Sequence, residues 1–268
     1  MSVEVTKQRE SNFELLRLMA MLLVVLVHAN FWSIGSPSQE YFSQEFFLST
    51  IRVLMESLSI VCVNVFVLIS GWFGIRMSWA KLFSFLFQIV YFNVICFLIY
   101  TILLGKTLGL DEAVKYFFLL TERYWFVKAY LGLMLIAPVL NLFIDKSDVK
   151  LKKYVLIGYF SFQCLYGWLL PSVSWISSGS SLSSFAFLYL LAGYAKNVPP
   201  PRVIKKISWK HYLIFYFLSA ISITAIYVFF LIKTGLGIGV FAYSCPIVII
   251  ESMSLFLFFL RFISVARW

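Results

Sequence analysis

Residues 13–28 read FELLRLMAMLLVVLVH, an almost wholly apolar stretch with a glutamate and an arginine near its start and a histidine at its end. A helix needs about 20 mostly apolar residues to cross a bilayer, and this run reaches that length when it is continued to residue 32. The stretch therefore predicts a membrane-spanning helix that carries ionisable side chains. The chain has only one other histidine, so His28 stands out.

The composition of the whole chain agrees with a membrane environment. Of the 268 residues, 62% are hydrophobic and 13% are charged. Soluble domains contain about 25% charged residues. Too few charged side chains are present to cover a globule of this size, so we predict an integral membrane protein.

Apolar runs of about the length of a membrane span occur eight times along the chain. We therefore predict an all-α, polytopic transmembrane bundle of about eight spans, at residues 13–32, 53–75, 82–104, 124–144, 154–170, 182–195, 212–232 and 240–260. The sixth run is short, which indicates a tilted or broken segment. Because the loops are short, residues 1–268 are expected to form a single domain.

The lysines and arginines predict the orientation, because short cytoplasmic loops are enriched in them. With both termini inside, 16 of the 22 basic residues fall on the cytoplasmic side. These are Lys7, Arg9, Arg17, Arg76, Lys81, Lys146, Lys150, Lys152, Lys153, Lys196, Arg202, Lys205, Lys206, Lys210, Arg261 and Arg267. The two clusters around residues 150 and 205 also require that spans five and six both cross the membrane, or that neither does.

The same pattern argues against other classes of protein. The net charge of +10 is distributed among loops between apolar spans, so we expect membrane lipids rather than nucleic acid as the charged partner. The four cysteines all lie in predicted spans and form no CxxC pair, which argues against disulfides and against a zinc site. No metal site and no bound cofactor are expected.

Arg17 and His28 are separated by 11 residues, which is close to three turns of an α-helix. They therefore project from nearly the same face, about 16 Å apart along the axis. Glu14, three residues before Arg17, shares that face and can pair with it. Arg17 could simply anchor the helix at the interface, and His28 could bond a neighbouring helix, but ionisable groups in spans are candidates for function because burying them is costly.

The spacing R-x10-H, with an acidic residue three positions before the arginine, resembles the acyltransferase-3 family of bacterial membrane-bound O-acyltransferases. Three further segments are similar to that family in the same order: NVFVLISGWFG at residues 64–74, YWFVKAYLGLMLIAPVLN at 124–141 and SLSSFAFLYLLAGYAK at 181–196. The resemblance thus extends over most of the chain.

The resemblance implies transfer of an acyl group, usually acetyl, to a hydroxyl of a cell-surface or envelope glycan, free or lipid-linked, in the bacterial plasma membrane. Acyl-CoA, usually acetyl-CoA, would be the co-substrate, and its phosphates would bind Arg17, Arg76 and Lys81. His28 would take the proton of the acceptor hydroxyl or form an acyl-imidazole, two routes that the sequence does not separate.

Five further residues are candidates for the site. Asn64 and Ser70, in the second family-like segment, are expected to support it. Tyr124 and Trp125 are expected to bind the acceptor, although both could belong to the aromatic belt at the membrane interface. Glu251, inside the last predicted span, either binds substrate or pairs with a basic group of another helix.

Two departures from the family pattern leave other functions open. The family often has closely spaced arginines after its second span, whereas this chain offers Arg76 and Lys81. The family core also has more spans than the eight predicted here, so the last spans are expected to be missing. A transporter or flippase, or a non-catalytic membrane protein, remains an alternative. The enzyme hypothesis predicts that Arg17 and His28 face one enclosed, polar-lined tunnel that opens toward the cytoplasm.

Overall fold

The computed structural model describes residues 11–105, 109, 114, 124–170, 177–201, 204, 206–235 and 239–265. Within these residues every regular element is a helix. The α-helices are α1 (Ser11–Val27), α2 (Gln39–Gln44), α3 (Phe46–Ser59), α4 (Cys62–Phe73), α5 (Trp79–Leu104), α7 (Trp125–Lys146), α8 (Val149–Cys164), α9 (Leu182–Asn197), α11 (Trp209–Thr234) and α12 (Pro246–Val265). Two π-helical turns, η1 (His28–Trp32) and η3 (Leu165–Leu169), and a short 3₁₀ turn, η4 (Ser177–Gly179), complete the set.

Five of these segments are long and apolar enough to cross a membrane. They are Ser11–Trp32, Phe46–Phe73, Trp79–Leu103, Trp125–Lys146 and Trp209–Thr234. The prediction of an all-helical, polytopic membrane fold is therefore confirmed. The total of eight spans and the cytoplasmic location of the termini stay predictions.

Two predicted spans differ from the helices observed. The second begins earlier, at Phe46, and is interrupted by a turn at Ile60 and Val61, which divides it into α3 and α4. The eighth begins later, because α12 starts at Pro246 and the preceding residues 239–245 form turns. Proline lacks a backbone N–H and is therefore well suited to the first turn of a helix.

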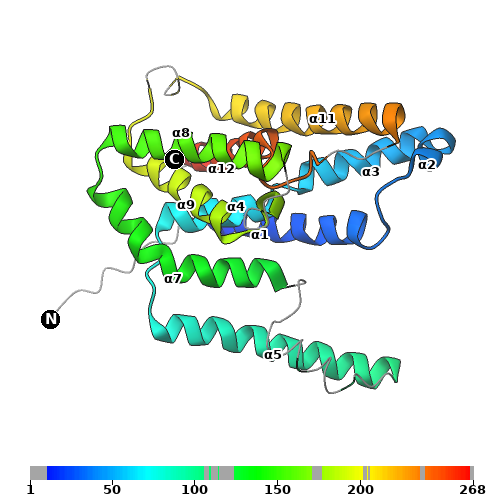
Figure 1. Ribbon diagram of the computed structural model, residues 1–268, viewed down its shortest axis with the longest axis horizontal. Coiled ribbons are helices and arrows are strands. Elements are labelled where there is room, and N and C mark those ends of the chain that lie inside the picture. Colours follow the sequence, from blue (N-terminus) through cyan, green and yellow to red (C-terminus); the bar gives the residue numbers. More distant parts are fainter. Residues whose placement is uncertain are drawn as a thin grey trace.

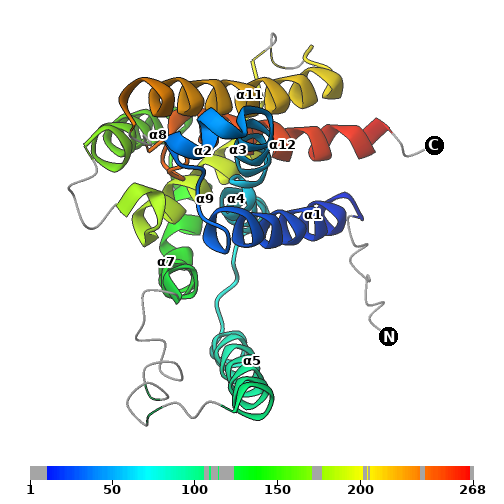
Figure 2. The same ribbon diagram turned by 90° about the vertical axis from the view of Figure 1, so that its right-hand side faces the viewer.

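Helix α4 lies in the centre of the bundle (Figures 1 and 2), where it packs against α1, α9 and α12. Its contact with α9 is close because Gly71 has no side chain: a Cβ atom at this position would collide with the backbone of Tyr189. Small residues allow membrane helices to approach in this way. Helix α11 packs on α3 and α12 at one side of the bundle, and α7 packs on α9.

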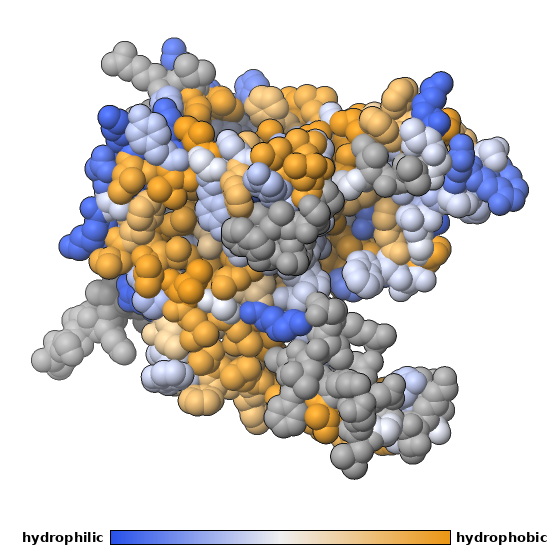
Figure 3. Space-filling view, viewed as in Figure 1, coloured by the Kyte–Doolittle hydropathy of each residue, from blue (hydrophilic) through white to orange (hydrophobic). Residues whose placement is uncertain are grey.

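Helix α5 lies at the edge of the bundle, apart from the other helices (Figures 1 and 2). Only 6% of the most apolar 18-residue stretch of this helix is buried. It contacts α7 through Phe85 and Tyr130, whose ring centroids are 5.6 Å apart. Most of its apolar surface therefore faces the surroundings, as expected for a helix in contact with lipid. Hydrophobic residues also cover most of the middle of the face in Figure 3, and hydrophilic residues gather mainly at its two ends.

The loops with the most basic residues meet at one end of the bundle, on the left in Figure 1. Arg76, between α4 and α5, lines one small cavity together with Asp145 and Lys196, which lie at the C-terminal ends of α7 and α9. Arg261 of α12 donates a hydrogen bond to the carbonyl of Ile207 at the same end. Of the basic residues that predict the orientation, Lys7, Arg9, Arg202, Lys205 and Arg267 lie outside the described residues.

The opposite end of the bundle is formed by η1, α2 and the turns at residues 239–245, together with the connection from α8 to α9. Ser244 Oγ donates a 2.7 Å hydrogen bond to the carbonyl of Gly167 in η3, which fixes this connection beside the turns. Helices α8 and α9 therefore both run from one end of the bundle to the other. That both helices cross the membrane, or that neither does, stays a prediction.

Candidate functional site

One face of α1 carries the charged part of the candidate site. Arg17 and Glu14 form the predicted ion pair, with 2.5 Å between Nη1 and Oε1. The guanidinium of Arg17 also lies over the ring of Phe73 in α4, with its Cζ atom 5.5 Å from the ring centroid. Since α1 is a regular helix throughout Ser11–Val27, the spacing to His28 keeps both residues near one face, as predicted.

His28 begins the π-helical turn η1. Its Nδ1 atom lies 2.8 Å from the backbone carbonyl oxygen of Val24. A carbonyl only accepts hydrogen bonds, so Nδ1 must be the protonated nitrogen and Nε2 keeps its lone pair in the neutral ring. The ring stacks on Trp32, with 6.0 Å between centroids. π-helical turns inside α-helices often occur at functional sites.

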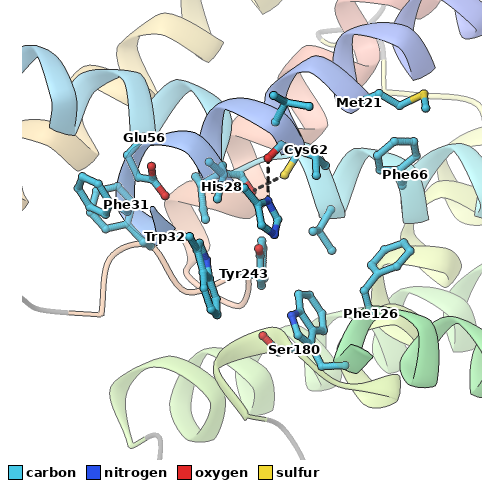
Figure 4. Close-up of a pocket in the computed structure, with 17 residues that line it drawn as sticks. Met21, His28, Phe31, Trp32, Glu56, Cys62, Phe66, Phe126, Ser180 and Tyr243 are labelled. Carbon is cyan, nitrogen blue, oxygen red and sulfur yellow. Dashed lines mark hydrogen bonds between the residues drawn. The ribbon is translucent and has the colours of Figure 1, made fainter. Parts of the chain in front are cut away.

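His28 lines a cavity of about 710 Å³, which is formed by α1, η1, α3, α4, α7 and the turns at residues 239–245 (Figure 4). Most of the lining is apolar or aromatic, and it includes Trp32, Trp125 and Tyr243. Glu56 and Ser180 contribute polar groups. Pockets for small molecules usually measure about 300–1,000 Å³ and combine an apolar lining with a few polar groups. This cavity fits that description.

Glu56 belongs to this site but was not included in the predicted set. It lies near the start of the second predicted span, residues 53–75, and the structure buries it to 3% exposure on the wall of the His28 cavity. Asn30 Nδ2 donates to Glu56 Oε2 at 3.0 Å and to the carbonyl of Arg52 at 2.8 Å. Arg52 Nε in turn donates to Asn30 Oδ1 at 3.2 Å. The feature of the sequence that could have identified Glu56 is the presence of a carboxylate within an apolar helix.

Arg17 lines a second cavity, of about 450 Å³, with Ser70, Tyr130, Phe66 and Phe126 among its other lining residues. Phe66 and Phe126 also line the His28 cavity. The two cavities are therefore neighbours that share these two rings. The expectation of one enclosed tunnel is corrected accordingly, because aromatic side chains lie between the two chambers.

Ser70 and Asn64 take different places. The hydroxyl of Ser70 lies 3.1 Å from that of Tyr130, beside Arg17. Asn64 is fully buried, and its Nδ2 donates at 3.1 Å to the carbonyl of Tyr243. Asn64 thus holds the turn that carries Tyr243 into the His28 cavity. Both residues adjoin the site, and their supporting role stays a prediction.

Of the three expected donor-binding cations, Arg17 and Arg76 line two different cavities and Lys81 lines neither of them. Arg76 lines a third cavity, of about 200 Å³, together with Asp145 and Lys196. This cavity and the Arg17 cavity share Phe73 and Gly74. Lys81 is exposed, and its Nζ donates at 3.0 Å to the carbonyl of Arg76.

Lys196 is a cation that the sequence analysis did not assign to the site. Lys196 is the last residue of the fourth family-like segment, and this position is the feature of the sequence that could have identified it. Its Nζ donates a hydrogen bond to the carbonyl of Trp72 in the last turn of α4, and it lines the same cavity as Arg76.

Of the three residues expected to bind the acceptor, Trp125 lies at the His28 cavity, with its ring 5.4 Å from that of Tyr243. Tyr124 instead donates a 3.0 Å hydrogen bond to Asn93 Oδ1 and so joins α7 to α5. Glu251 is fully buried in α12 and is not among the residues lining the His28 or Arg17 cavity. The structure brings Trp125 to the site and does not bring Tyr124 or Glu251 there.

The fold and these cavities define a multi-pass membrane protein with a histidine-bearing pocket inside its helix bundle. The chain matches the acyltransferase-3 family, described as "Acyltransferase domain", over residues 10–268, and it belongs to that family. The resemblance seen in the sequence is thereby confirmed, and membership supports acyl transfer as the activity. No match to the chain was found among curated proteins or among solved structures.

Proposed function

We propose that this protein transfers an acyl group, usually acetyl, from acyl-CoA to a hydroxyl of a cell-surface or envelope glycan at the bacterial inner membrane. The observation that carries the proposal is the state of His28. Its Nδ1–H is bound to the Val24 carbonyl, and its ring lines a cavity large enough for a small-molecule substrate. The free Nε2 atom is therefore available to react.

In the direct route, Nε2 of His28 removes the proton from the acceptor hydroxyl while the hydroxyl oxygen attacks the thioester carbonyl. The new ester bond forms, the bond between carbon and sulfur breaks, and the departing sulfur of coenzyme A takes up the proton from His28. The Val24 carbonyl holds the ring in the required tautomer throughout. In the alternative route, Nε2 attacks the thioester carbonyl first, the bond between carbon and sulfur breaks, and the thiolate of coenzyme A departs. The acceptor hydroxyl then attacks the acyl-imidazole, the bond between the acyl carbon and Nε2 breaks, and the hydroxyl proton passes to the thiolate.

The donor would bind from the end of the bundle where the basic residues gather. Arg17 and Arg76 line neighbouring cavities there, and a guanidinium can bind a phosphate through two parallel hydrogen bonds. Arg17 is already oriented by Glu14 and Phe73. The acceptor would enter the His28 cavity, where Glu56 and Ser180 can bond its hydroxyls and Trp125 offers an aromatic face.

The test is an assay of acyl-CoA consumption with candidate glycans, using the protein in lipid nanodiscs. His28→Ala should lower the rate of transfer by about 10²- to 10⁴-fold, the usual contribution of a general base, with acyl-CoA binding nearly unchanged. His211→Ala is the matched control, because His211 is the other histidine of the chain and is exposed at the start of α11.

A loss below about threefold for His28→Ala would contradict a role in catalysis. Membrane insertion and acyl-CoA binding are measured on the same preparations. If His28→Ala removes insertion and binding together, His28 is structural and the proposal fails.

A further inference from the structure

Two aromatic rings stand between the Arg17 cavity and the His28 cavity. Phe66 comes from α4 and Phe126 from α7, and both line both cavities. Their ring centroids are 6.5 Å apart and the ring planes meet at 65°. Figure 4 shows the two rings at one end of the His28 cavity, near Met21 and away from Trp32.

The Phe126 ring is fixed by its neighbours. It stacks on Tyr130 with 5.8 Å between centroids and an angle of 13°, and it packs edge-on against Phe185 at 5.5 Å. Trp125 contacts it as well, with 6.0 Å between centroids. Such pairs favour defined arrangements of the rings. Phe126 is therefore a rigid side of the boundary between the two cavities.

A donor held by Arg17 has to span this boundary to react at His28. The two residues lie about 16 Å apart along α1, because 11 residues at 1.5 Å each separate them. The phosphates of coenzyme A are charged, and the apolar surface of two phenylalanine rings gives them no partner, so their passage would be costly. The thioester end of the molecule is uncharged and unbranched, so it can pass beside the rings.

We propose that Phe66 and Phe126 form a constriction that admits the thioester end of the donor to His28 and selects unbranched acyl groups over branched or aromatic ones. This inference rests on the proposed use of acyl-CoA. The rings hold back the phosphate-bearing part at Arg17 and limit the width of the group that enters the His28 cavity.

The experiment compares initial rates with acetyl-CoA, butyryl-CoA, isobutyryl-CoA and benzoyl-CoA. Butyryl and isobutyryl groups contain the same atoms and differ only in branching. The ratio of their rates therefore depends on the width of the constriction. We expect the wild type to favour butyryl-CoA and Phe66→Ala or Phe126→Ala to lower that preference by about tenfold, because removing either ring widens the constriction. The scale is that of other small differences in shape, since an apolar pocket discriminates a change of one methylene by about 10- to 200-fold. Benzoyl transfer should increase in the same two variants.

Phe229→Ala is the matched control, because Phe229 lies on the exposed face of α11, away from both cavities. It should keep the wild-type ratio. A ratio measured within one preparation does not depend on the fraction of protein that is folded. Phe66→Leu is included as a variant that retains an apolar side chain, and its ratio should lie between those of the wild type and Phe66→Ala.

The outcomes separate this inference from the function on which it rests. If the wild type consumes no acyl-CoA with any glycan, the proposed function fails, and the constriction fails with it. If the wild type is active but the butyryl to isobutyryl ratio is the same in all variants, the proposed function stands and the constriction is refuted.

Discussion

Asn30 and Glu56 connect the π-helical turn that begins at His28 to helix α3, through a 3.0 Å hydrogen bond from Nδ2 to Oε2. Asn30 lies two residues after His28, and Glu56 lies on the wall of the same cavity. The amide of Asn30 also bonds the backbone and side chain of Arg52. The backbone that carries His28 is therefore fixed to α3 by a polar network at the η1 end of the cavity.

Replacing Glu56 tests this network. Glu56→Ala removes an acceptor for the Asn30 amide, and we expect the free energy of unfolding to fall by about 1–3 kcal/mol, as for other buried hydrogen-bonded groups. Glu56→Gln retains an oxygen that can accept from Asn30, so its loss should be smaller. The measurement is the thermal unfolding midpoint in detergent micelles. Equal losses in both variants would show that this hydrogen bond does not stabilise the protein.

Lys196 should help to hold the donor if acyl-CoA binds at the basic end of the bundle. Its Nζ donates to the carbonyl of Trp72 at 2.7 Å and lines the same cavity as Arg76 and Asp145. Lys196→Met keeps the apolar stem and removes the charge. We expect KM for acyl-CoA to rise and kcat to stay nearly constant, because the ammonium would bind the donor equally in the ground and transition states.

The control for Lys196 is Lys153→Met, which removes one positive charge from an exposed position on α8. Both variants are assayed at low and high salt, because distant surface charges are screened as ionic strength rises. An equal rise of KM in the two variants would mean that the total positive charge of the protein, and not the position of Lys196 in the cavity, explains the effect. A fall of kcat for Lys196→Met alone would place Lys196 nearer to the chemistry than we infer.

The sequence predicts those parts of the molecule that depend on local geometry. The helical fold follows from apolar runs of membrane length, and the Glu14–Arg17 pair follows from their spacing of three residues within one helix. The common face of Arg17 and His28 has the same origin, because α1 remains regular between them. The four family-like segments led to the correct family.

Features that depend on contacts between helices could not be predicted in this way. Glu56 lies near one end of the second predicted span, but its burial depends on how α1 packs on α3. Lys196 reaches Arg76 only because α9 crosses α4 closely at Gly71. Glu251 shows the converse: the sequence predicts that it either binds substrate or pairs with a basic group of another helix, whereas the packing of α12 encloses it in the core, away from the linings of the His28 and Arg17 cavities. Helical periodicity contains no information on these neighbours.

The orientation of the bundle is open to a direct test. A reporter that is active only outside the cytoplasm should give a signal when it is fused after Ser178, in the connection from α8 to α9. The same reporter fused after Lys206 should give none. The prediction depends on the 16 basic residues that the proposed orientation places inside, of the 22 in the chain. The reverse pattern would overturn the assignment of both termini to the cytoplasm.

Arg17 provides the most specific test of the donor site, because its guanidinium is fixed between Glu14 and Phe73 and faces the second cavity. Arg17→Ala should weaken acyl-CoA binding, measured by isothermal titration on protein in nanodiscs. Arg17→Lys should restore only part of the affinity, since a point charge cannot reproduce the planar fork that binds two phosphate oxygens.

The comparison with His28→Ala separates the roles of Arg17 and His28, which lie near one face of α1. Loss of the base should lower the rate and leave the affinity for the donor nearly intact, whereas loss of Arg17 should lower the affinity first, because the two side chains lie about three helical turns apart. Glu14→Gln serves as the control for Arg17, because it removes the ion pair and keeps the arginine. Full recovery of binding by Arg17→Lys would reduce Arg17 to a nonspecific positive charge at the membrane surface, which is the anchoring role that the sequence also allowed.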